Sequence, residues 1–157
     1  MMAMLKFVVL FLSVVFLASA ADLPSKKYLN LAALKTMVAA AEAEAQKRGV
    51  EVTICIMDES GNLLFLQKAD GASLNTLQFA QKKAKYAALY GQPSGAAEDS
   101  LKKGNLGILA FPDGFPNRGG LPIKVDGKAI GAMACSGAPS EVDEAISQVA
   151  IDALLKP

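Results

Sequence analysis

The sequence predicts a single α+β domain built on a mainly antiparallel sheet of about five strands, with helices packed against it. Apolar residues recur at helical spacing near both ends of the chain, and short runs rich in Val and Ile lie between them. Asp126-Gly127 separates two apolar runs, which is a strong hairpin signal. The length of 157 residues suits one domain, and a hydrophobic content of 52% excludes a disordered chain.

The first expected elements are a helix and a strand pair. Asn30 can cap a helix that runs to about Lys47, and Gly49 follows at a position typical of a helix end. Residues 50–57 form a strand that is apolar on both faces, so both faces should be covered. A turn at 58–62 leads into a second strand. The remaining expected elements are strands at 63–67, 106–111, 121–125 and 129–136, helices at 76–90 and 140–155, and a short helix from Ser94 that ends before Gly104.

Residues 1–20 have the pattern of a secretory signal peptide. Lys6 precedes an apolar run at 7–17, and Ala18-Ser19-Ala20 forms a small-residue cleavage site. The alternative is an uncleaved N-terminal anchor, although the run is short for a membrane span. Cleavage removes one of 16 basic residues and none of the 15 acidic ones, so the domain at 21–157 has no formal net charge. We therefore expect a periplasmic or secreted protein without nucleic-acid partners and without stable membrane insertion after processing.

The chain contains no His, which excludes several kinds of site. Ser-His-Asp and Cys-His nucleophile systems need an imidazole, as do His metal sites and His pH switches. Two Cys cannot build a zinc site of four thiolates. The acidic turn residues Asp58 and Asp70 are explained by turn geometry, so no catalytic residue is predicted.

Four segments carry a resemblance when they are taken in order: residues 55–63, 68–72, 83–89 and 119–138. Together they resemble the GlcG/HbpS-like family, often called heme-binding proteins, over nearly all of the chain after residue 20. The resemblance implies a profilin-like sandwich and homo-oligomers. It also implies heme as a cofactor in some members, while others accompany glycolate or diol metabolism. Lys68 stands where the family often has Arg, and a Lys lacks the planar fork that binds a carboxylate.

The sheet order of the family places the strand of Cys55 beside the strand of Cys135. A cross-strand disulfide therefore stands as one possibility, and a thiolate ligand to heme as another. We expect two buried free thiols instead, because a pair in the wrong register cannot close.

One face of the expected helix at 76–90 is aromatic and basic. Phe79, Lys83, Tyr86 and Tyr90 are spaced by four, three and four residues. Such a face offers rings for a porphyrin to stack on and an ammonium for a propionate. The alternatives are an oligomer interface and ordinary packing. With no His in the chain, the candidate iron ligands are Tyr86, Tyr90 and Met133.

The loop before the last hairpin is the second candidate. Phe111, Phe115, Arg118, Gly119 and Gly120 lie within it or at its end. Arg118 and the exposed glycine N–H groups could hold a carboxylate. Alternatively, the glycines only permit positive φ and the Phe rings fill the core.

These candidates lead to three functional hypotheses. We favour an exported heme-binding protein that acts as a carrier or redox-sensing accessory rather than as an enzyme. The second hypothesis is a binding protein or enzyme for a small carboxylate such as a 2-hydroxy acid. The third is a structural homo-oligomer without a ligand.

Overall fold

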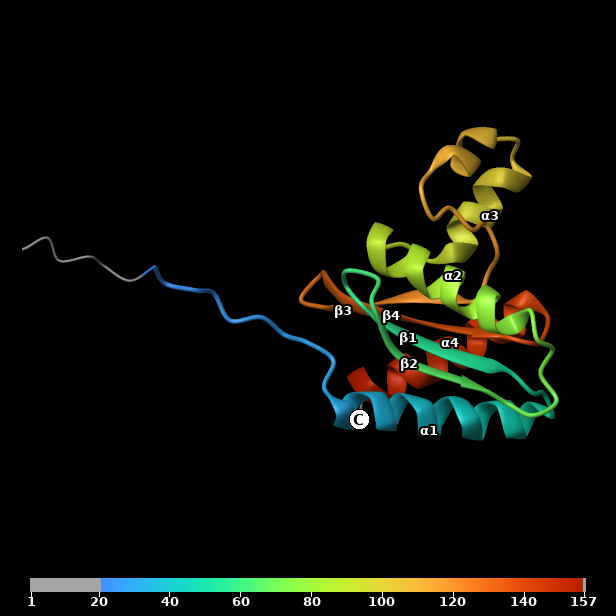
Figure 1. The fold of residues 1–157 in the computed structure, drawn as a ribbon, viewed down its shortest axis with the longest axis horizontal. Helices are drawn as coiled ribbons and strands as arrows, with labels where there is room; N and C mark the ends of the chain where they lie inside the picture. Colours follow the sequence, from blue (N-terminus) through green and yellow to red (C-terminus); the bar gives the residue numbers. More distant parts are fainter. Residues whose placement is uncertain (1–20, 157) are drawn as a thin grey trace, which may run out of the picture.

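The computed structural model describes residues 21–156, so the expected signal peptide lies outside the described residues. One four-stranded antiparallel sheet has the strand order β2-β1-β4-β3 (Figure 1). Helices α1 and α4 cover one face of this sheet, and α2 covers the other. The elements are α1 (Leu31–Arg48), β1 (Thr53–Asp58), β2 (Leu63–Lys68), α2 (Thr76–Tyr90), α3 (Ser94–Lys102), a short 3-10 helix η1 (Leu106–Ala110), β3 (Gly120–Val125), β4 (Lys128–Ser136) and α4 (Ser140–Leu155).

The expected strand at 106–111 is wrong, and the sheet has four strands instead of about five. Asn105 accepts a hydrogen bond from the N–H of Gly107, which starts a helical turn. None of the η1 residues is buried, and the segment lies beyond α3, away from the sheet. A short apolar run has no periodicity that separates a strand from a helical turn, which explains the error.

Local signals placed the other elements correctly. The Asn30 side chain accepts from the N–H of Ala33 at 2.8 Å and caps α1, which ends at Gly49 with a left-handed φ of 66°. Asp126 and Gly127 both have positive φ, at 52° and 76°, as a two-residue hairpin turn requires. Among the described helices, none combines the length and apolar content of a membrane span.

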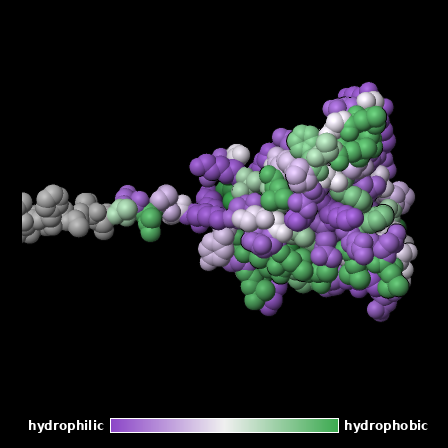
Figure 2. All heavy atoms as spheres, turned by 45° about the horizontal axis from the view of Figure 1, so that its top comes forward, coloured by the Kyte–Doolittle hydropathy of each residue, from purple (hydrophilic) through white to green (hydrophobic). Residues whose placement is uncertain are grey.

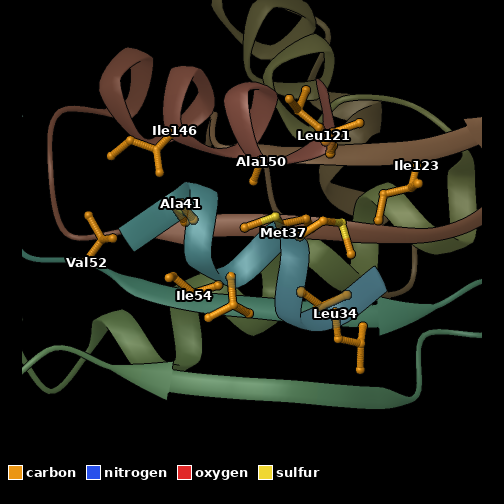
Figure 3. Packing of buried hydrophobic residues seen from close by; sticks show 14 of the residues in the cluster. Leu34, Met37, Ala41, Val52, Ile54, Leu121, Ile123, Ile146 and Ala150 are labelled. Atoms are coloured by element: carbon orange, nitrogen blue, oxygen red, sulfur yellow. The ribbon is translucent and has the colours of Figure 1, made fainter. Parts of the chain in front are cut away.

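Two apolar cores lie on opposite faces of the sheet. The core under α1 and α4 contains large side chains, including Met37, Ile123 and Ile146 (Figure 3). The core under α2 is built from small side chains, with Ala80 and Ala84 of the helix among them. Small residues let the axis of α2 approach the sheet closely. A long side chain on this face of the helix must therefore extend beyond the alanines to reach other groups.

The strand register decides the state of the two cysteines. Cys55 lies opposite Ala134, and Cys135 lies opposite Ile54, so the two thiols are one residue out of register. Cys55 packs in the core under α2 and Cys135 in the core on the other face. Both are free, as expected, and burial raises the pKa of each thiol to about 12. Neither is suited to act as a thiolate ligand.

Candidate functional site

Aromatic side chains from α2 and from the loop at 111–117 contact one another in two groups along α2. The rings of Phe79 and Phe115 lie 5.3 Å apart, and those of Tyr90 and Phe111 lie 5.7 Å apart with edge-to-face geometry. Tyr86 contacts Tyr90 at 4.8 Å. These five residues are called the aromatic surface below. The spacing along α2 predicts that Phe79, Tyr86 and Tyr90 share a helix face, whereas the contacts between helix rings and loop rings were not predicted.

Part of this surface is open. Phe79 is 36% exposed and Phe111 is 50% exposed, whereas Tyr86 is only 6% exposed. Leu106 and Leu109 of η1 are also exposed, and Figure 2 shows hydrophobic side chains gathered at the end formed by α3 and η1. An exposed apolar cluster of this kind is typical of a binding surface.

The loop is attached to α2 by polar contacts. The Tyr90 hydroxyl donates to the carbonyl of Pro112, and the Lys85 ammonium binds Asp113 at 2.9 Å. Lys82 places its Nζ atom 5.5 Å from the centre of the Phe115 ring. A cavity of about 200 Å³ lies between α2 and the loop. Enclosed ligand pockets measure about 300–1,000 Å³, so a large flat ligand must lie across this surface rather than inside the cavity.

Lys83 does not belong to the open face. The prediction that its ammonium lies beside the rings and is available to a ligand is wrong. The side chain is 1% exposed, and its Nζ atom lies 2.8 Å from an Asp143 carboxylate oxygen and 3.3 Å from the carbonyl of Cys135. Asp143 also accepts from the N–H of Ala138 at 3.0 Å. Burial raises the pKa of Asp143, while Lys83 opposes that rise. The pair joins α2 to the first turn of α4.

Gly119 and Gly120 contribute to this packing. Gly119 has a positive φ, as the alternative above expects, but Gly120 does not, and Phe111 is exposed instead of filling the core. A Cβ atom on Gly119 would lie 2.9 Å from the Nζ atom of Lys83, and the residue has a φ of 127°. The N–H of Gly120 donates to the Ser94 hydroxyl at 2.9 Å. The Ser147 hydroxyl donates to the carbonyl of Gly119 at the same distance. The Gly120 N–H therefore has a partner within the chain and is not free to hold a ligand carboxylate.

Arg118 is also fully engaged. Its guanidinium donates to Glu144 at 2.9 Å and to Asp99 at 2.8 Å, and its backbone N–H donates to Glu98 at 2.7 Å. Hydrogen bonds to Glu144 and Asp99 raise the pKa of Arg118. The residue joins α3 to α4, and both arms of its fork already hold carboxylates.

The candidate iron ligands differ in accessibility. Met133 is fully buried in the core under α1 and α4, on the face of the sheet opposite the aromatic surface. Burial raises the pKa of the Tyr86 hydroxyl. Tyr90 is partly exposed. Tyr90 is thus the one residue of these three that is not buried, and its hydroxyl donates to the carbonyl of Pro112. Within residues 21–156, no cluster of His, Cys, Asp and Glu large enough to hold a metal ion occurs.

Lys68 and Asp58 stabilise loops. The Lys68 ammonium donates to the carbonyls of Ala69 and Ala72, both at 2.7 Å. Asp58 accepts from the backbone of Ser60 and Asn62, in agreement with the predicted turn role.

Comparison with known proteins agrees with this fold. Residues 29–152 match the family described as "Haem degrading protein HbpS-like". The chain belongs to this HbpS-like family. Protein GlcG of Escherichia coli K12 is 31% identical over 112 residues, which cover 71% of this chain and 84% of GlcG.

Two solved structures support the assignment to the HbpS-like family. The Klebsiella pneumoniae protein ORFY has a TM-score of 0.79 and 26% identity, and the match covers 88% of this chain and 99% of ORFY. The PduOC:heme complex has a TM-score of 0.75 and 27% identity, with 81% and 95% covered. The predicted family and α+β class are thereby confirmed, apart from the strand count.

Proposed function

We propose that this HbpS-like chain is an exported heme-binding protein, a carrier or redox-sensing accessory, that holds the macrocycle across the aromatic surface. The observation that carries the proposal is the open cluster of rings on α2 and its loop, with two lysines beside it. Rings stack on a porphyrin, and ammonium groups bind its propionates. The solved heme complex of a structural neighbour gives the proposal independent support.

The side chains of this surface would hold heme by stacking on its ring and by offering a ligand to its iron. Phe79, Phe111 and Phe115 offer exposed or partly exposed ring faces and edges. Tyr90 is the candidate iron ligand because Tyr86 and Met133 are buried, and its hydroxyl would have to release the carbonyl of Pro112 to bind iron. Bound heme would supply a redox-active iron. The protein would supply stacking, charge and orientation.

Two of the other grooves suit heme less well. A groove of about 540 Å³ beside the end of α1 has Glu42, Glu51 and Asp70 as its charged lining, which would repel propionates. A groove of about 680 Å³ beside the β3–β4 hairpin has no aromatic side chain in its lining, and its Lys27 pairs with Asp126. Both therefore lack the combination of rings and unpaired lysine seen on α2.

Titration with hemin tests the proposal. We expect a shifted Soret band that saturates at a stoichiometry of one heme per site, with a changed visible spectrum in Tyr90→Phe. Tyr28→Phe is the matched control, because Tyr28 is exposed but lies outside the aromatic surface. Absence of both a Soret shift and saturation at micromolar hemin would refute heme binding. A second measurement separates a carrier from a heme-degrading protein. When a reductant is added in air, the Soret band of a carrier's heme complex should stay stable. A heme-degrading protein should lose its Soret band faster than free hemin does under the same conditions.

The small-carboxylate alternative finds less support in the geometry. Arg118 would have to release Asp99 or Glu144 to bind such a ligand, and Gly120 would have to release Ser94. A thermal-shift screen with 2-hydroxy acids separates the two hypotheses. Stabilisation by such an acid, lost in Arg118→Ala, would favour the alternative.

Export and homo-oligomer formation belong to the same proposal. Mass spectrometry of the protein from its native host should show a chain that begins at Ala21. Light scattering should give a mass above that of a single chain. The exposed leucines of η1 are the surface most suited to a contact between copies.

A further inference from the structure

The small cavity between α2 and its loop has an unusual charge distribution. Its lining consists of Lys82, Lys85, Asp113 and Gly114. Two ammonium groups and one carboxylate leave this cluster with one unbalanced positive charge. The cluster adjoins Phe115 of the aromatic surface, so a ligand stacked there brings its substituents close to both lysines.

The two lysines have different partners. Lys82 is exposed and forms no ion pair with the described residues, and its Nζ atom faces the Phe115 ring. Lys85 binds Asp113 at 2.9 Å, and both side chains of that pair are about 40% exposed, at 42% and 39%. Ion pairs with this much contact with water are weak and can be exchanged for another carboxylate.

The position of Asp113 depends on a constrained backbone. Asp113 has a φ of 56°, in the left-handed region that few residues other than Gly adopt. A Cβ atom on the next residue, Gly114, would lie 2.9 Å from the carbonyls of Ile108 and Phe111. The tight turn therefore presents the Asp113 carboxylate to Lys85 on α2.

We propose that Lys82 and Lys85 bind the carboxylates of the ligand, and that Asp113 is an internal competitor which a ligand carboxylate displaces from Lys85. This inference rests on the proposed function. It names the side chains that bind the two propionates of heme. Lys83 and Arg118 do not serve this role, because both are already paired inside the fold. Stacking on Phe115 and binding at the lysines act together, since both lie on the same side of α2.

Paired titrations with hemin and hemin dimethyl ester test the inference, because the ester lacks the propionate charges. We expect Lys82→Gln/Lys85→Gln to weaken hemin binding about tenfold and Asp113→Asn to tighten it about two- to fivefold. Neither variant should alter binding of the ester. Lys35→Gln/Lys47→Gln on α1 is the control that removes the same charge far from the site, and it should match the wild-type chain.

The outcomes separate this inference from the proposed function. If the wild-type chain binds hemin and the lysine variant binds it equally well, the subsite is refuted while heme binding stands. An equal loss for hemin and for the ester also refutes the subsite, because the effect is then not on carboxylates. If Asp113→Asn fails to tighten hemin binding, its role as competitor is refuted. If the wild-type chain binds no hemin, both proposals fail.

Discussion

Replacing Lys83 by Met tests the most consequential contact of the structure. The substitution keeps an unbranched side chain but removes the ammonium from a pair that is 1% and 2% exposed. Asp143 then keeps its hydrogen bond from Ala138 and loses its only buried counter-charge among the described residues. Removal of one partner from a buried ion pair costs about 3–5 kcal/mol, out of a total stability of about 5–15 kcal/mol for a typical domain.

Urea unfolding monitored by circular dichroism measures this cost. We expect the midpoint of Lys83→Met to fall by about 2 M, given a slope of about 1–3 kcal/mol per M. Lys83→Met/Asp143→Asn removes both charges and should recover most of the loss, because the amide still accepts from Ala138. Lys85→Met is the matched control on the same helix. Its half-exposed pair with Asp113 predicts a cost of about 1 kcal/mol or less.

The pH dependence of stability provides an independent check on the buried pair. In Lys83→Met, burial holds the pKa of Asp143 above its unfolded value, and no ammonium opposes the rise. Between those two pKa values the folded state binds more protons than the unfolded state. The contribution of Asp143 to the free energy of unfolding therefore increases as the pH falls, by up to about 1.4 kcal/mol per pH unit, and levels off below the unfolded pKa. In the wild-type chain the contribution of Asp143 has the same sign over a narrower range, because Lys83 opposes the rise of its pKa. A cost below about 1 kcal/mol would refute the buried pair, as would a stability gap between Lys83→Met and Lys83→Met/Asp143→Asn that does not narrow on acidification.

Three further predictions follow from buried groups. Cys55 and Cys135 should remain unreactive toward a thiol reagent in the native protein and react after unfolding, because burial raises both thiol pKa values to about 12; rapid native labelling would contradict this. Gly119→Ala should cost at least about 2 kcal/mol in urea unfolding, since its Cβ would meet Lys83 at 2.9 Å and its φ is positive; an unchanged midpoint would contradict the close approach. Thr76→Val should cost about 1–3 kcal/mol by the same assay, because it leaves the buried Thr53 hydroxyl without its partner at 2.7 Å, and Thr76→Ser is the control that keeps the bond.

Local sequence rules placed most of the fold. Asn30, Gly49 and Asp126-Gly127 each act within a few residues, so their effect on the backbone can be predicted without knowledge of the tertiary structure. The prediction of a strand at 106–111 failed because the secondary structure of this segment depends on whether a neighbouring strand is present. An apolar run becomes a strand only when another strand is present to pair with it, and η1 lies beyond α3 without one.

The candidate site was predictable only where it depends on helical spacing. Tyr86 and Tyr90 contact each other, as their spacing of four residues predicts. The contacts of Phe79 and Tyr90 with the rings of the loop could not be predicted from that spacing. Lys83 shares that spacing but turns inward to Asp143, which is 60 residues away in sequence. No local pattern signals a partner at that distance, and the cleft that admits the lysine exists because Gly119 lacks a Cβ atom.

The same packing explains why neighbouring lysines on one helix have different roles. The alanines of α2 bring its axis close to the sheet, so Lys83 extends past them to Asp143 in the first turn of α4. That buried pair fixes the rotation of α2 about its axis. The rotation in turn directs Lys82 and Lys85 toward the loop that carries Asp113 and Phe115. A buried charge pair with no direct contact to ligand therefore orients the surface that we propose binds it.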